Sequence, residues 1–182
     1  MVLRLEIDYT YCTPVHGFCM VVLGIDPGSR TTGYAVVSRK SGRFHLVEAG
    51  TVCSNPKNDI PTRLHTIYTG LYEIIGRFSP DSAAIEAIFR HKSSESALRL
   101  GQARGVALLA LAQYKLPITD YNPMTVKKSI GGSGRAGKTE MIRVVTRLLG
   151  LKKDLPSDAA DAAAIAMTHL IHSAFQARIP KK

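Results

Sequence analysis

Cysteine is scarce in this chain of 182 residues. Its three cysteines, Cys12, Cys19 and Cys53, are odd in number and lack the CxxC spacing of a zinc site. Neither a disulfide framework nor a structural zinc ion is therefore indicated, and buried or incidental thiols are the ordinary interpretation. A reducing cytoplasm is the expected compartment.

Long hydrophobic runs are missing as well. No apolar stretch approaches the ~18–20 residues that span a bilayer, so no membrane partner is expected. Residues 1–20 contain Glu6 and Asp8 and have no continuous apolar core, which is not typical of a secretory signal. The hydrophobic content of 45% is nevertheless enough for a folded core.

Acidic residues are few, and they are outnumbered by basic residues in only one segment of the chain. The chain carries 24 Lys and Arg against 14 Asp and Glu, a net charge of +10. Residues 1–89 and 154–182 are each balanced, whereas residues 90–153 hold 13 basic residues and only three acids. Such a segment predicts a polyanionic partner, nucleic acid first, because neutralising phosphates releases counterions. A solvated basic face is the plainer alternative.

The order of apolar segments predicts a mixed α/β domain with a sheet covered by helices. Three strands form a meander, and then helix, strand, helix, strand and two further helices follow. The expected strands are 21–25, 34–37, 44–51, 83–88 and 117–121, and the expected helices are 61–78, 93 or 94 to 114, 139–149 and 157–174. Residues 131–137 are a flexible, glycine-rich break. We expect one domain over 20–175, an amino-terminal extension over 1–19 of unknown role, and a basic tail over 176–182.

Four acids occupy positions where a carboxylate is costly. Asp26 ends the first strand, Glu86 interrupts the apolar fourth strand, and Asp158 and Asp161 lie three residues apart in the last helix. Alone, each has an ordinary explanation: a turn cap, an exposed strand end, or a first-turn acid favoured by the helix dipole. Together they are expected to converge, because the first and fourth strands are neighbours and positions i and i+3 share a helix face.

Converging carboxylates repel one another unless a cation lies among them. Oxygen-only ligands suit Mg²⁺ or Mn²⁺, and two such ions are a known arrangement for phosphodiester hydrolysis. His169 lies two helical turns beyond Asp161 and could reach this point, but a packing or capping role is the expected one.

Four stretches in this order, GIDPGSRTTGY, AIEAIF, ALRLGQARGVALLA and SDAADAAAIAMTH, resemble the RuvC family of Holliday-junction resolvases over about residues 20–172. The resemblance implies an RNase H-like fold with a five-stranded mixed sheet, and a homodimer that cuts two strands of a four-way DNA junction symmetrically. It implies a preference for a short, T-containing sequence and ligatable nicks as products. A branch-migration motor complex as partner and the bacterial cytoplasm as location are implied too.

The resemblance assigns roles residue by residue. Its four metal-binding and catalytic acids map onto Asp26, Glu86, Asp158 and Asp161, which would hold two Mg²⁺ ions per active site, with Mn²⁺ as a substitute. The expected DNA contacts are Phe89, which would stack on an unpaired base, and the basic residues Arg90, Lys92, Lys127 and Lys138. For Phe89, a core position is the plainer alternative.

Two features depart from the family pattern. Ala87 stands where Gln is common, which affects local junction contacts, and residues 1–19 have no counterpart. Three other functions were weighed: an actin-like phosphotransferase, which needs two large domains, a non-catalytic junction-binding module, and another RNase H-like nuclease acting on RNA–DNA hybrids or flaps. LGQARG and Phe89 favour the junction resolvase.

Overall fold

The structure is a computed structural model that describes residues 20–87, 94–132, 134 and 136–176. The expected extension over 1–19, most of the tail, and the expected DNA contacts Phe89, Arg90 and Lys92 lie outside the described residues. None of the helices within these ranges is long and apolar enough to cross a membrane.

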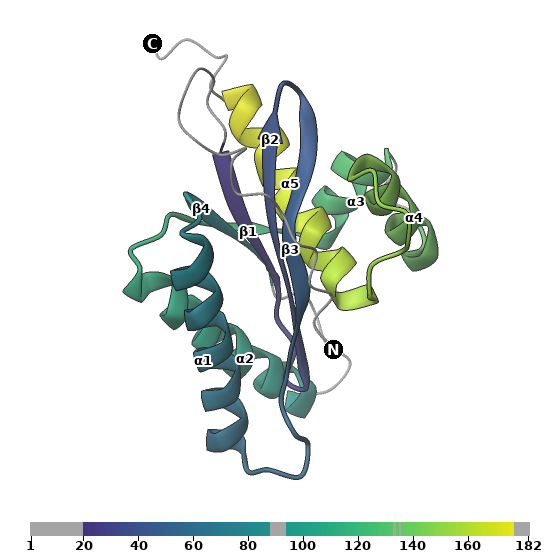
Figure 1. The fold of residues 1–182 in the computed structure, drawn as a ribbon. Helices are drawn as coiled ribbons and strands as arrows, with labels where there is room; N and C mark the ends of the chain where they lie inside the picture. The colour runs from purple at the N-terminus through teal and green to yellow at the C-terminus, as the bar shows by residue number, and fades with distance from the viewer. Residues whose placement is uncertain (1–19, 88–93, 133, 135, 177–182) are drawn as a thin grey trace.

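A five-stranded sheet forms the centre of the molecule (Figure 1). Its strands are β1 (Met20–Asp26), β2 (Thr31–Lys40), β3 (Arg43–Cys53), β4 (Ser82–Glu86) and β5 (Ile118–Tyr121). Their order across the sheet is β3-β2-β1-β4-β5. The meander β1–β2–β3 is antiparallel, whereas β4 and β5 run parallel to β1, so the sheet is mixed as predicted.

Helices cover both faces of the sheet. On one face lie α1 (Ile60–Phe78) and α2 (Ser94–Gln113), and on the other lies α5 (Ser157–Gln176), with α3 (Pro123–Gly131) and α4 (Lys138–Leu148) beyond it (Figure 1). Each face has its own hydrophobic cluster. The central strand β1 is therefore buried on both sides from Val22 to Ile25, as its apolar sequence predicts.

Local signals explain where the helices begin and end. The Asp59 side chain accepts a hydrogen bond from the main-chain N–H of Thr62 and caps α1, which ends at Ser79 in the left-handed region. Helix α3 is bounded in the same way. The Asn122 side chain caps its start, and Gly132, at φ 70° in the left-handed region, caps its end. The sequence analysis did not predict α3, a short helix that follows β5 directly.

Two predicted boundaries need correction. The fourth strand ends on Glu86 rather than running through to 88, so this acid lies at a strand end and does not interrupt the strand. That is the alternative position considered for it. The glycine-rich break begins one residue later than expected, because α3 extends through Gly131, and the helix expected from 139 begins at Lys138.

Candidate metal and DNA site

The site is built on the carboxyl ends of two neighbouring parallel strands. Asp26 is the last residue of β1 and Glu86 is the last residue of β4, and the two strands pair from Val22 to Ile25. Strand side chains alternate between the two faces. Because Val22 and Ala84 pack on the α5 face, Asp26 and Glu86 project toward that same face.

Helix α5 brings two more acids to this edge of the sheet. It begins at Ser157, so Asp158 and Asp161 occupy its first two turns, and both are partly buried. The helix approaches closely because the sheet has no side chain beneath it. A Cβ atom built on Gly33, which pairs with Asp26, would lie 2.0 Å from the main-chain oxygen of Asp158.

Gly24 has the same role one turn further along the helix. A Cβ atom there would lie 2.1 Å from the main-chain oxygen of Ala162. The motif GIDPGSRTTG therefore supplies an acid and also two glycines that allow α5 to pack against the sheet at backbone distance. The sequence analysis used the acid and missed the glycines.

Three of the four predicted acids form one cluster. Ligand oxygens of Asp26, Asp158 and Asp161 all lie within 4.8 Å of one another. Glu86 belongs to the same electrostatic neighbourhood, since it acts on Asp26 both through its charge and through a side-chain hydrogen bond. The structure thus brings together residues that are separated by as many as 135 positions in the chain.

Crowding of the carboxylates shows in their electrostatics. Burial is the largest cause that raises the pKa of Asp26, and the charges of Glu86, Asp161 and Asp158 raise it further, to about 8. A carboxyl that prefers to be protonated at neutral pH lies among groups that repel its charge. A bound cation would remove this penalty.

The chemistry of the donor set fits a hard divalent cation. Every ligand oxygen in the cluster belongs to a carboxylate, and no sulfur or imidazole ligand is part of it. Among the described residues, this is the one group of three or more His, Cys, Asp or Glu side chains whose ligand atoms lie close enough together to share a metal ion. Such oxygen-only sites bind Mg²⁺, Mn²⁺ or Ca²⁺ rather than zinc or copper.

Basic residues from α3 and α4 line an open pocket of about 200 Å³ together with two of the acids. Its wall includes Glu86, Asp161, Lys127 and Lys138. The Nζ atom of Lys138 lies 3.3 Å from a carboxylate oxygen of Asp161. Both lysines predicted to bind DNA are therefore beside the acidic cluster.

The acids also act on Lys138. Burial works to lower the pKa of this lysine, but the Asp161 carboxylate, followed by Asp158 and Asp26, outweighs it, so the pKa is raised. Lys138 is thus held as a cation at the edge of the cluster, and its side chain is still 62% exposed. It is free to turn toward a phosphate that enters the pocket.

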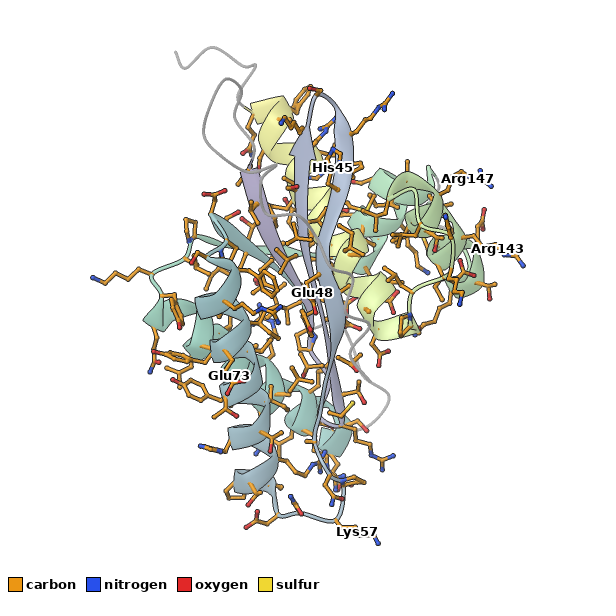
Figure 2. All side chains as sticks on the ribbon, viewed as in Figure 1. His45, Glu48, Lys57, Glu73, Arg143 and Arg147 are labelled. Atoms are coloured by element: carbon orange, nitrogen blue, oxygen red, sulfur yellow. The ribbon has the colours of Figure 1, made fainter. Side chains whose placement is uncertain are left out.

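The basic middle segment divides into two parts. Its first part is partly neutralised, because Arg99 pairs with Glu95 and Arg104 pairs with Asp120. Beyond the pocket, Arg143 and Arg147 project from α4 toward solvent, and Figure 2 shows both pointing away from the molecule. Within the described part of this segment, α3 and α4 carry five basic residues against the single acid Glu140: Lys127, Lys128, Lys138, Arg143 and Arg147.

His169 packs within the core, as expected. Its two ring nitrogens lie 3.1 Å from the hydroxyls of Ser82 and Tyr121, and burial lowers the pKa of the ring. These contacts link α5 to β4 and β5. The imidazole has no hydrogen-bonding nitrogen left for the acidic cluster.

The pocket wall is the main part of the site that the sequence analysis missed. Val126 and Met141 line it together with the two lysines, and they come from α3 and α4. The signal for α3 was present in the sequence as Asn122 followed by Pro123, a cap and a first helical residue. It was hidden because the apolar stripe of so short a helix is weak.

Comparisons with known proteins agree with this geometry. The family model described as crossover junction endodeoxyribonuclease RuvC matches residues 22–169. A protein of that name from Photorhabdus laumondii is 49% identical over 150 residues, which are 82% of this chain and 86% of the relative. Another from Citrifermentans bemidjiense is 43% identical over 155 residues, 85% of this chain and 94% of the relative.

Solved structures give the same result. The chain superposes on Thermus thermophilus RuvC in complex with a Holliday junction substrate with a TM-score of 0.82 and 36% identity, covering 86% of this chain and 96% of that one. The yeast mitochondrial resolvase Ydc2, at 16% identity and a TM-score of 0.61, shares the fold. The predicted RNase H-like fold is thereby confirmed. The chain belongs to the RuvC family of crossover junction endodeoxyribonucleases.

Proposed function

We propose that this protein is a Mg²⁺-dependent endonuclease that resolves four-way Holliday junctions by paired phosphodiester hydrolysis in DNA recombination and repair. The observation that carries the proposal is the cluster of Asp26, Asp158 and Asp161, because Asp161 also lines a pocket together with Lys127 and Lys138. Acids that concentrate cations and lysines that attract phosphate are the two parts that metal-dependent phosphodiester hydrolysis needs.

The four acids are the proposed metal ligands and catalytic residues. Asp26 lies at the centre, since the charges of Glu86, Asp158 and Asp161 all act on it. Two Mg²⁺ ions per site, with Mn²⁺ as a substitute, suit this oxygen-only set. Bound there, the ions would activate the attacking water and stabilise charge on the departing oxygen. The acids themselves would hold the ions and fix their positions. Because the acids are partly buried, fewer other water molecules reach the ions.

The proposed DNA contacts lie around the same pocket. Lys138 would exchange its carboxylate partner Asp161 for a backbone phosphate once cations neutralise the acids, and Lys127 would hold the same strand from α3. Phe89, Arg90 and Lys92, just beyond Glu86 in sequence, would contact the unpaired bases and phosphates at the branch point.

Two symmetric cuts require two active sites, so we propose a homodimer. A face of α2 supports this assignment. Leu98 and Leu109 are 63% and 53% exposed, and Gly105 lies between them with open space above it. Helices associate closely through such small and apolar positions. Light scattering of the wild-type protein and of Leu109→Glu should give a dimer and a monomer, respectively; a monomeric wild type contradicts the proposal.

Location and partner follow from the same function. We place the protein in the bacterial cytoplasm, where junction DNA is formed, and propose that it acts with a branch-migration motor complex. The bacterial relatives named above support the compartment. Co-purification of the motor with junction-bound protein, compared with protein alone, would test the partner.

The decisive experiment offers the purified protein a mobile four-way junction and a linear duplex of matched sequence, with Mg²⁺ and with chelator. Paired nicks are expected only on the junction with Mg²⁺. Asp26→Asn is expected to bind the junction but not cut it, because it loses a ligand charge while it keeps the shape of the side chain. Equal cutting of the linear duplex, preferred cutting of RNA–DNA hybrids, or full activity of Asp26→Asn would each contradict the proposal.

A further inference from the structure

Two arginines reach the strand ends of the site from the opposite side of the sheet. Arg63 lies on α1 and Arg104 lies on α2, the two helices that cover the face away from α5. Neither side chain belongs to the acidic cluster or lines the pocket beside it. Each donates hydrogen bonds to the main chain close to one of the strand-end acids.

Arg63 holds the turn that follows Asp26. Its guanidinium donates to the carbonyl of Ser29 and, over 3.4 Å, to the hydroxyl of Ser54. The Ser54 hydroxyl in turn lies 3.1 Å from the same Ser29 carbonyl and 3.3 Å from that of Arg30. One buried side chain from α1 and one from the end of β3 therefore fix the backbone just after the acid.

The charge of Arg63 has no obvious structural use. The residue is only 9% exposed, and within the described part of the chain no carboxylate lies within ion-pair distance of it. Placing an unpaired cation in a protein interior is costly. A neutral side chain would fill the same space at lower cost, so the rigid fork of donors is the feature that distinguishes this residue.

Arg104 holds the second strand end in a similar way. Its Nε atom donates to the main-chain carbonyl of Glu86 over 3.2 Å, and another guanidinium nitrogen donates to the Asp120 carboxylate over 2.7 Å. Asp120 is in β5, next to β4. The Arg104 side chain is 17% exposed, whereas Asp120 is 54% exposed, so the contact with the Glu86 carbonyl is the more buried of the two. Arg104 thereby ties the ends of β4 and β5 together at the residue that carries the acid.

We propose that Arg63 and Arg104 are positioning residues that set the metal affinity of the acidic cluster by fixing the backbone at Asp26 and Glu86. The proposal rests on the proposed function, because it assumes that these acids hold the metal. The four acids repel one another, and Asp26 and Glu86 each lie one residue beyond the last pair of β1 with β4, Ile25 and Ile85. The arginines supply a further restraint from the face of the sheet opposite α5 and the acidic cluster.

The test measures metal affinity directly as well as through cleavage. Arg63→Gln and Arg104→Gln are compared with wild type and with Arg77→Gln, which removes an exposed arginine from α1. Mn²⁺ binding is measured by calorimetry, and cleavage of a four-way junction is measured as a function of Mg²⁺ concentration. The concentration for half-maximal effect is expected to rise about 10-fold in the two variants, as is typical when residues that orient metal ligands are removed.

Two further readouts separate positioning from general stability. Cleavage at saturating Mg²⁺ should return to within about twofold of wild type, and junction affinity in chelator should stay unchanged, because no substrate contact is lost. Arg104→Lys should retain the metal defect, since an ammonium cannot span both the Glu86 carbonyl and the Asp120 carboxylate. Arg77→Gln should match wild type throughout.

An unchanged metal titration in both Gln variants, even with a lower melting temperature, would overturn the inference. Complete rescue by Arg104→Lys would overturn it for that residue, because charge alone would then suffice. The proposed function fails separately: a wild-type protein that binds Mn²⁺ at the cluster but does not cut junctions contradicts the nuclease assignment. In that case a loss of Mn²⁺ affinity in the variants still supports the positioning role.

Discussion

The two faces of the sheet are built from different kinds of residue. On the α5 face, six of the buried helix residues are alanines, and the helix backbone rests on Gly24 and Gly33. On the other face, α1 contributes large aliphatic side chains that are almost fully buried, Ile67, Leu71 and Ile75, whereas α2 adds Leu111 beside three buried alanines. The acids that form the cluster all project on the first face.

This difference means that one face mainly sets the positions of the acids, and the other mainly contributes to the stability of the fold. Small residues allow α5 to approach at backbone distance, which brings Asp158 and Asp161 within reach of Asp26, but they bury little apolar area per residue. Large side chains remove more apolar surface from water and so contribute more stabilisation, at about 25 cal/mol per Å². We therefore expect truncation of apolar side chains on the α1–α2 face, unlike substitution of Arg63 and Arg104, to change mainly stability. Substitutions on the α5 face are expected to change mainly metal binding and cleavage.

The largest effect is expected from Leu71→Ala on the α1–α2 face. Leu71 is fully buried, and truncating such a side chain leaves a cavity that costs about 3 kcal/mol of unfolding free energy. Urea denaturation measures the loss, and Leu148→Ala, at a leucine that is 43% exposed on α4, is the control expected to stay within about 0.5 kcal/mol. The Mg²⁺ concentration for half-maximal cleavage should not move. A shift in that Mg²⁺ concentration would contradict the expected difference between the two faces of the sheet.

Gly33→Ala, on the α5 face, should instead lower mainly the rate of cleavage. The new methyl group would meet the main chain of Asp158 at 2.0 Å, so the start of α5 must move away from Asp26. A misplacement of about 1 Å in a catalytic arrangement can lower the rate about 100-fold, which is the loss we expect in single-turnover cleavage. Gly101→Ala, where nothing lies within 4 Å of the added atom, is the matched control. Wild-type rates with Gly33→Ala would show that close packing is not required.

The third expected effect concerns pH. The pKa of Asp26 is raised from 3.8 to about 8 in the folded protein, chiefly by burial and then by Glu86. Between these values the folded state binds more protons than the unfolded state, so this group stabilises the fold at low pH and its contribution falls as pH rises toward 8. In chelator, wild type should therefore lose stability relative to Asp26→Asn between about pH 5 and pH 8.

Denaturant midpoints of both proteins at the two pH values measure this difference, and the comparison cancels the titration of groups that do not interact with Asp26. Saturating Mg²⁺ should abolish the loss in wild type, because the ion replaces the proton as the partner of the carboxylate. Parallel pH profiles for the two proteins in chelator would mean that Asp26 is ionised normally in the fold. The crowding of charge inferred for the α5 face would then be absent.

Much of the fold was accessible from local sequence signals. The five strands were predicted within a few residues, because buried strands are short apolar runs that end at turn residues such as Pro27 and Gly28. Four of the helices described above were predicted for the corresponding reason, with apolar residues at helical spacing. The missed helix α3 and the misplaced end of β4 at Glu86 lie where the apolar pattern is too short to decide.

The sequence by itself determined which residues are available for the chemistry: four costly acids, a basic middle segment, and an order of elements that brings two strand ends together. Only the tertiary structure decided how close they come. Gly24 and Gly33 are ordinary strand residues until α5 rests on them, and Arg63 is one of many basic residues until α1 carries it beneath the turn after Asp26. Distances between segments depend on packing between distant parts of the chain, which no local pattern records.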